Sequence, residues 1–174
     1  ILVKRKVILR LLKNLRKKKK CYYMKNHVLS KKVYLMVGCP GSGKSTWVNE
    51  HELPFVSRDK VRIDLGFCGP DEKYLGTKEE EDRVTKECDR QREELISRGI
   101  DFAIDDTNVR KFRREELIRK LRESGYHVVG VLMKTELKVC LERRKGEIPE
   151  GAIVSMWNSS REVDPSEFDE LIEV

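Results

Sequence analysis

The stretch Gly38-Cys39-Pro40-Gly41-Ser42-Gly43-Lys44-Ser45-Thr46 lies between an apolar run, Val33–Val37, and a segment compatible with a helix. Its spacing, G-x-x-x-x-G-K-[ST], predicts a phosphate-binding loop, because glycines let the backbone aim several N–H groups at one anion. The N-terminus of the following helix adds partial positive charge. The pattern also occurs in ordinary glycine-rich turns, but the flanking strand and helix favour a nucleotide site. We expect Lys44 to reach the β- and γ-phosphates and the Ser45 hydroxyl to ligate Mg²⁺.

The positive charge of the chain is concentrated at its N-terminus. The 174 residues carry a net charge of +7, yet no acidic residue precedes Glu50. Residues 1–39 hold 13 Lys and Arg, so the remaining 135 residues hold 24 basic and 30 acidic side chains, a net charge of −6. A chain of this length forms about one domain. We therefore expect a basic N-terminal extension over residues 1–31 and one folded domain over residues 32–174.

The extension alternates short apolar clusters with basic residues and ends in a run of Arg and Lys at positions 16–20. Its apolar clusters are too short and too charged for a membrane span. Four interpretations stay open: a basic arm that adds nucleic-acid affinity, an amphipathic helix on an anionic membrane, a targeting segment, or a solvated and partly disordered extension.

The cysteines and histidines are scattered. Five cysteines occur without a C-x-x-C pair, and the three histidines are equally dispersed. This usage is typical of a reducing compartment and predicts a cytoplasmic protein without a disulfide framework or a zinc site. Mg²⁺, brought by the nucleotide, is the only metal that we expect.

From Lys32 onward the pattern repeats strand, loop and helix, which predicts an α/β fold with a parallel sheet covered by helices. We predict strands at 33–37, 54–56, 101–104 and 127–133. We predict helices at 44–51, 77–98, 110–124, 135–145 and 149–157, a loop at 66–77, and a last helix in the acidic tail, 165–174.

The second strand is followed by the charged cluster Ser57-Arg58-Asp59-Lys60-Val61-Arg62. Ligands bind beyond the carboxyl ends of parallel strands, and residues three apart share a face of a helix. Asp59 is therefore a candidate general base, or else it caps a helix beginning at Lys60. Arg62 is a candidate for binding a phosphate of the acceptor, or else a surface residue paired with Asp59 or Asp64.

Two further pairs of adjacent charged residues are candidates for the active site. Asp105 and Asp106 follow the third strand, where they could hold Mg²⁺ through water or orient a nucleophile; alternatively, residues 106–108 form a turn. Arg143 and Arg144 end a helix where a lid would close over a triphosphate. Arginines at helix C-termini also interact with the helix dipole, so that role stays open.

A phosphate loop alone does not separate an ATPase, a GTPase and a kinase. An N/T-K-x-D strand end, which guanine-specific switches carry, is not found after any predicted strand, and the chain is short for a motor. The class that remains is a small kinase, in which a carboxylate activates an acceptor hydroxyl and cations stabilise the transferring phosphoryl group.

Taken together, the loop with its trailing Trp47, the cluster at 57–62 and Asp106-Thr107-Asn108 resemble the 5′-kinase domain of phage-type polynucleotide kinase. The resemblance covers residues 32–160, including Tyr74-Leu75-Gly76-Thr77-Lys78 and the Arg-rich segment before Pro149. It implies a three-layer P-loop kinase fold. It also implies transfer of the γ-phosphate of ATP to a 5′-hydroxyl end of DNA or RNA.

By position, the resemblance implies that Lys44 and Ser45 hold the phosphates and Mg²⁺, that Asp59 is the general base, and that Arg62 binds the 3′-phosphate of the acceptor nucleotide. Asp106 matches an acidic residue that organises the acceptor side. The family has two arginines four apart before a V-P element, whereas here Arg143 and Arg144 are adjacent. We favour Arg143 as the lid arginine. No residues are present for the phosphatase domain of the phage enzyme.

Two other functions stay open. A P-loop kinase for a small metabolite, nucleoside or sugar would tolerate the acidic body, because it needs no positive channel along a strand. A nucleic-acid-binding module acting through residues 1–20, with a nucleotide site that only switches shape, would not depend on Asp59.

Overall fold

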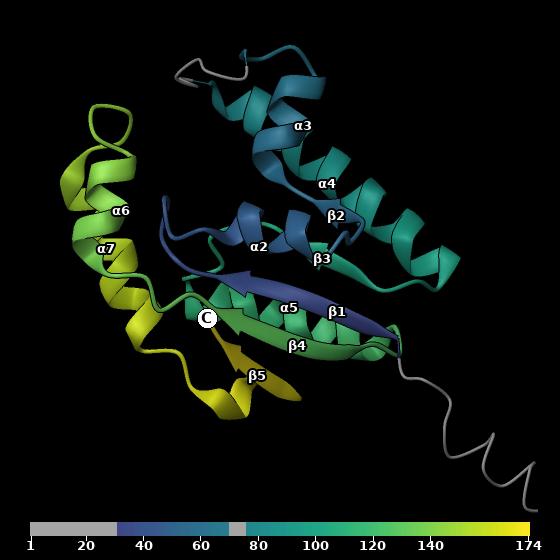
Figure 1. Cartoon of the computed structure of the whole chain (residues 1–174). Helices are drawn as coiled ribbons and strands as arrows, with labels where there is room; N and C mark the ends of the chain where they lie inside the picture. Colours follow the sequence, from purple (N-terminus) through teal and green to yellow (C-terminus); the bar gives the residue numbers. More distant parts are fainter. Residues whose placement is uncertain (1–30, 70–75) are drawn as a thin grey trace, which may run out of the picture. The chain divides into compact units, whose positions relative to one another are not determined.

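The computed structural model describes residues 31–69 and 76–174. Residues 1–30 of the basic extension and the Tyr74-Leu75 part of the family resemblance lie outside the described residues. In the described part a single parallel sheet carries the fold, with the strand order β2-β3-β1-β4-β5 (Figure 1). Its strands are β1 (Lys32–Val37), β2 (Phe55–Val56), β3 (Phe102–Ile104), β4 (His127–Leu132) and β5 (Glu170–Glu173).

The helices occupy the connections between these strands. They are α2 (Lys44–Glu50), α3 (Arg58–Asp64), α4 (Lys78–Arg98), α5 (Lys111–Glu123), α6 (Leu137–Arg143), α7 (Glu150–Arg161) and a 3₁₀ turn, η1 (Pro165–Glu167). Among the described residues, none of these helices is both long enough and apolar enough to cross a membrane.

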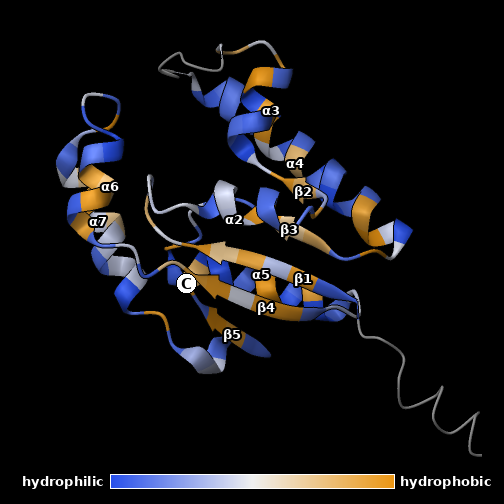
Figure 2. Cartoon of the chain, viewed as in Figure 1, coloured by the Kyte–Doolittle hydropathy of each residue, from blue (hydrophilic) through white to orange (hydrophobic). Residues whose placement is uncertain are grey.

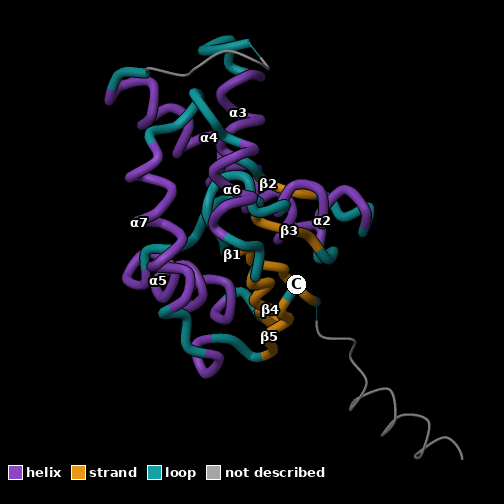
Figure 3. Tube along the Cα trace, turned by 60° about the vertical axis from the view of Figure 1, so that its left-hand side comes forward, coloured by secondary structure: helices purple, strands orange, loops and turns teal. Residues whose placement is uncertain are grey.

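Alternation along β1 divides the core into two layers. Val33, Leu35 and Val37 pack with side chains from α4 and α5, whereas Met36 packs with Trp47 and Val48 of α2. Successive side chains of a strand point to opposite faces, so one apolar strand supplies both layers. Figure 3 shows α2 and α5 on opposite sides of the strands. The predicted three-layer α/β fold is therefore confirmed.

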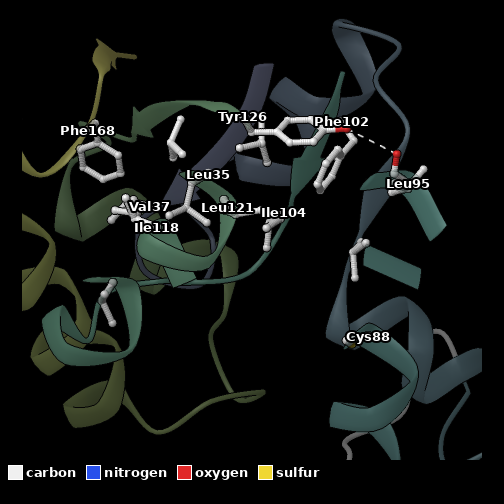
Figure 4. Packing of buried hydrophobic residues seen from close by; sticks show 14 of the residues in the cluster. Leu35, Val37, Cys88, Leu95, Phe102, Ile104, Ile118, Leu121, Tyr126 and Phe168 are labelled. Atoms are coloured by element: carbon white, nitrogen blue, oxygen red, sulfur yellow. Dashed lines mark hydrogen bonds between the residues drawn. The ribbon is translucent and has the colours of Figure 1, made fainter. Parts of the chain in front are cut away.

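The central strands β1 and β4 are mostly apolar but begin with the polar residues Lys32 and His127, whereas the helices are largely hydrophilic (Figure 2). In the larger layer, the Phe102 and Tyr126 rings meet edge to face with centroids 5.4 Å apart. The Tyr126 hydroxyl donates to the carbonyl of Ile100 at 3.0 Å, with the carbonyl of Leu95 at 3.4 Å (Figure 4), so the one polar atom of this side chain is satisfied within the core.

The prediction of a terminal helix over residues 165–174 is wrong. The tail forms η1 and then β5, which runs parallel to β4 with Leu171 opposite Gly130. The Phe168 ring fills the space above Gly130, where a Cβ atom would lie 2.7 Å from the ring. The Asp169 carboxylate accepts a hydrogen bond from the backbone N–H of Val128 at 2.7 Å. Pairing with β4 outweighs the amphipathic pattern of the tail. As a strand, the tail pairs with the backbone groups at the edge of β4, which a surface helix would leave unpaired.

Candidate active site

The phosphate loop Gly38–Thr46 connects β1 to α2 at the carboxyl end of the sheet, and its last three residues, from Lys44 on, form the first turn of α2. Gly41 and Gly43 have φ values of 81° and 95°, in the left-handed region that glycine adopts without strain. A Cβ atom at Gly41 would also lie 2.9 Å from the carbonyl oxygen of Cys140 in α6. The loop therefore needs glycine for its own conformation and for close contact with the helix above it.

Lys44 lies inside this loop and is only 9% exposed. Its Nζ donates to the carbonyl of Cys39 at 2.9 Å. Burial lowers the pKa of Lys44, and the nearby carboxylate of Asp105 opposes that shift. Cys39 is buried, and burial raises the pKa of its thiol to about 12, so this side chain of the loop packs as a neutral group in the cluster with Cys140 and Ile153.

The acceptor candidates lie on α3. The helix begins at Arg58 with Ser57 as its N-cap, so the alternative that Asp59 caps it is wrong. The Asp59 side chain is 87% exposed. Its Oδ1 accepts a hydrogen bond from Nη1 of Arg62 at 2.5 Å. This is the pairing with Asp59 that the alternative for Arg62 predicted, whereas Asp64 pairs with Lys60.

Glu81, which no sequence pattern singles out, holds both arginines of α3. The Oε1 atom of Glu81 accepts from Nε of Arg62 at 2.9 Å, and its Oε2 atom accepts from Nη2 of Arg58 at 2.6 Å. The hydrogen bond from Arg62 is the main cause that lowers the pKa of Glu81 to about 2, and the bond from Arg58 adds to it. Glu81 belongs to the first turn of α4, 19 residues beyond Arg62. No local pattern could have paired them.

The carboxylates after β3 occupy two different environments. Asp105 is buried, and burial raises its pKa while a hydrogen bond with Ser45 opposes the shift. Asp106 accepts from the backbone N–H of Arg58 at 3.2 Å, and burial raises its pKa to about 6. The structure has a bend at Asp106 and not the alternative turn over residues 106–108; Asn108, with φ 46°, donates from Nδ2 to the carbonyl of Met36 at 2.8 Å. This contact ties the end of β3 to the end of β1.

The two candidate lid arginines differ in their contacts. Arg143 donates from Nη1 to the carbonyl of Gly41 at 3.0 Å, so it touches the phosphate loop. Arg144 pairs with Glu147 at 2.7 Å. Both end the helix α6, whose Cys140 packs with Cys39 and Ile153 of α7.

A single cavity of about 1090 Å³ joins these groups. Its lining includes Lys44, Asp59, Arg62, Asp106 and Arg143, so the structure brings together all five residues predicted to be catalytic. It also includes Ser45, Arg144, Glu81 and two arginines that sequence analysis did not single out, Arg110 and Arg113. Gly38 and Cys39, which were predicted to bind the nucleotide, are not in this lining.

Trp47 contributes mainly to packing. It is 8% exposed, belongs to the core layer between the sheet and α2, and stacks on His51 with ring centroids 3.7 Å apart. One edge of it also reaches the cavity lining.

The fold and the loop define a P-loop kinase. The chain belongs to the AAA domain family, whose model matches residues 33–151. It is 29% identical, over 125 residues, to a protein of Autographa californica nuclear polyhedrosis virus to which the name bifunctional polynucleotide kinase/RNA ligase has been assigned. The match covers 66% of this chain but only 18% of that relative.

Solved structures share the fold. A chain in the Pnkp1/Rnl/Hen1 RNA repair complex matches with a TM-score of 0.64 at 22% identity, over 75% of this chain and 44% of that chain. Shikimate kinase from Aquifex aeolicus matches with a TM-score of 0.50 at 19% identity, over 82% of this chain and 86% of that chain. The same fold thus occurs in a nucleic-acid repair assembly and in a kinase named for a small acceptor.

The residues present fit a nucleotide with Mg²⁺, the cofactors that this kinase family implies. The exposed hydroxyl of Ser45 and the carboxylate of Asp105 are oxygen donors, which Mg²⁺ prefers. The loop supplies backbone N–H groups and Lys44 for the phosphates.

Proposed function

We propose that the chain transfers the γ-phosphoryl group of ATP to the 5′-hydroxyl end of DNA or RNA. The observation that carries the proposal is the shared cavity, in which the phosphate loop opens toward Asp59 and Arg62 of α3. The name of the viral relative supports the choice of a polynucleotide acceptor.

On the donor side, the loop Gly38–Thr46 binds the triphosphate and Ser45 holds Mg²⁺, which neutralises charge on the phosphates when it is bound. Lys44 and Arg143 stabilise the negative charge of the transferring group. Arg143 is suited to this role because it already contacts Gly41 within the loop.

On the acceptor side, Asp59 accepts the proton of the 5′-hydroxyl. The oxygen of that hydroxyl bonds to the γ-phosphorus as the bond between this phosphorus and ADP breaks. The exposure of Asp59 leaves one side of its carboxylate open to an incoming hydroxyl. Arg62 binds the 3′-phosphate of the acceptor nucleotide. Asp106 holds the start of α3 through the N–H of Arg58.

A small-molecule kinase is the second candidate. The fold match with shikimate kinase and the net charge of −6 outside the first 39 residues favour it. The two candidates differ in the acceptor alone, because each uses the same donor loop.

Transfer of labelled γ-phosphate tests the proposal. Single-stranded DNA and RNA with 5′-hydroxyl ends are compared with matched 5′-phosphate strands and with a panel of sugars, nucleosides and shikimate. We expect label at 5′-hydroxyl strands only, and its loss in Asp59→Asn. Transfer to a small acceptor with none to either strand would overturn the proposal in favour of the second candidate.

A further inference from the structure

The first turn of α5 carries an unusual set of charges. Its N-cap is Arg110, followed by Lys111, Phe112 and Arg113, and the turn holds no acidic residue. A helix N-terminus carries partial positive charge and is normally stabilised by acidic side chains. The first turn of α4 follows that rule with Glu79, Glu80 and Glu81. The cations of α5 therefore add to the partial positive charge of the helix N-terminus, and no acidic residue in the first turn offsets them.

Two of these cations face the candidate active site. Arg110 and Arg113 line the same cavity as Lys44 and Asp59. Both are exposed, and neither has an ion pair or a hydrogen-bonding side-chain partner within the described residues. By contrast, Lys111 lies 3.8 Å from Glu115. The cavity thus contains two arginines whose charge is available to an anionic ligand.

Other arginines of the same cavity form ion pairs with glutamate side chains. Arg58 and Arg62 are held by Glu81, and Arg144 is held by Glu147. The next residue of α5, Arg114, is buried and forms a bidentate pair with Glu167 at 2.7 and 2.9 Å. Arg143 has no acidic partner either, but it donates to the carbonyl of Gly41, so within the described residues Arg110 and Arg113 are the cavity arginines without a hydrogen-bonding side-chain contact to the protein.

Phe112 is 77% exposed, the highest value among the exposed large apolar side chains of the described residues. It lies next to Arg113 on the helix but is not part of the cavity lining. An aromatic ring beside arginines is the combination with which proteins bind single-stranded nucleic acid, since bases stack on the ring and phosphates contact the cations. A small anion inside the cavity would make no use of a ring outside it.

We propose that this turn binds the strand that continues from the acceptor nucleotide, with Arg110 and Arg113 on its phosphates and a base stacked on Phe112. Arg110 is the N-cap of α5 and Arg113 lies in its first turn, and both side chains belong to the lining of one cavity. Asp59, Arg110 and Arg113 line the same cavity, and Phe112 lies between the two arginines in the chain but outside the lining. This inference rests on the proposed function and adds the path of the substrate.

Steady-state kinetics on two acceptors test it. One acceptor is a single-stranded 5′-hydroxyl oligonucleotide of about ten nucleotides, within the usual site size of such surfaces. The other is a nucleoside 3′-monophosphate, which carries the acceptor hydroxyl and the phosphate for Arg62 but no further strand. The variants are R110A/R113A, F112A and F112W. The matched control is R119A/K120A, which removes the same charge from exposed positions of α5 outside the cavity.

For R110A/R113A we expect the oligonucleotide KM to rise on the order of tenfold more than the KM for the monophosphate. The slope of log affinity against log salt concentration should shrink by about 1.4, because each phosphate contact on a single strand contributes about 0.7 to this slope and two contacts are removed. For F112A we expect a rise of about 5- to 100-fold for the oligonucleotide, as for loss of one stacked base, with recovery in F112W. The control should keep the ratio of the two KM values found in the unmodified protein.

Failures of the two proposals are distinguishable. If the unmodified protein labels both acceptors and R110A/R113A keeps its KM ratio and salt slope, the strand path is overturned while the kinase function stands. If F112A alone behaves as the unmodified protein, the stacking is overturned. If the unmodified protein labels neither acceptor, or only the monophosphate, both proposals fall.

Discussion

The donor side and the acceptor side of the cavity are built in different ways. The donor side is one continuous loop, Gly38–Thr46, and its central side chain, Lys44, is 9% exposed. The acceptor side combines α3, α4 and the end of β3, and its candidate base, Asp59, has a side chain that is 87% exposed. The loop conformation is fixed by its own glycines, whereas Arg58 and Arg62 are fixed by Glu81 from another helix.

This difference teaches that the two sides respond to different changes. A buried lysine in a glycine loop is set by burial and backbone geometry, which vary little with solvent conditions. Ion pairs that join two helices depend on a partner distant in the sequence, so the acceptor side can be altered without touching the loop. Substitutions on the donor side should therefore change the KM for ATP, and substitutions on the acceptor side should change the KM for the acceptor.

Asp59→Asn should give the largest effect. It keeps the shape of the side chain and removes the proton acceptor, so kcat should fall on the order of 10²–10⁴-fold. The KM for ATP should stay near its original value, because the donor loop is unchanged. Steady-state transfer to a 5′-hydroxyl oligonucleotide measures both constants. A loss below tenfold would mean that another group takes the proton.

Lys44→Met should lower kcat by about 10²–10³-fold, the usual effect of removing one donor that stabilises developing charge. Unlike Asp59→Asn, it should also weaken ATP binding, while the KM for the acceptor changes little. Titration with ATP and with the acceptor in the same assay separates the two effects. An altered acceptor KM with an unaltered ATP KM would contradict the division into two sides.

Glu81→Gln should act only on the acceptor side. Hydrogen bonds between charged groups contribute about 1.5–3 kcal/mol, so loosening Arg62 should raise the acceptor KM roughly tenfold or more. The ATP KM should not follow. Because its pKa is about 2, Glu81 stays charged down to about pH 2, and its ion pairs with Arg58 and Arg62 should persist from pH 8 to pH 5.

Glu79→Gln is the matched control for this experiment. Glu79 is exposed in the same first turn of α4, and its substitution removes the same charge as Glu81→Gln. Equal effects of the two substitutions would show that the charge of the turn matters and not the contacts of Glu81.

Asp106→Asn should give the smallest effect, and on stability. Burial raises the pKa of Asp106 to about 6 in the folded chain, above its ordinary value of 3.8. Protonation therefore favours the folded state: this contribution is fully present below about pH 3.8 and is lost as the pH rises through 6. Asn cannot lose a proton, so the variant should gain stability relative to the original chain between pH 4 and pH 7, on the order of 2–3 kcal/mol. Urea unfolding at both pH values measures the difference. The same difference at both values would contradict the assignment.

The sequence alone determined the parts of this protein that are local in the chain. The apolar run of β1 and the spacing of Gly38–Thr46 predicted the phosphate loop, and the repeated strand–loop–helix pattern predicted a parallel sheet covered by helices. The strand-end rule also brought Asp59, Arg62 and Asp106 toward one cavity. These features depend on backbone propensity and on hydrophobic periodicity, which act over a few residues.

Tertiary structure decided the features that join distant segments. The tail became β5 because the edge of β4 offered backbone partners and Gly130 left room for Phe168. Glu81 came to hold the arginines of α3 because α3 packs on α4, and Arg114 found Glu167 53 residues away. Such partners are set by the positions that packing gives to two elements in space, which local sequence patterns do not encode.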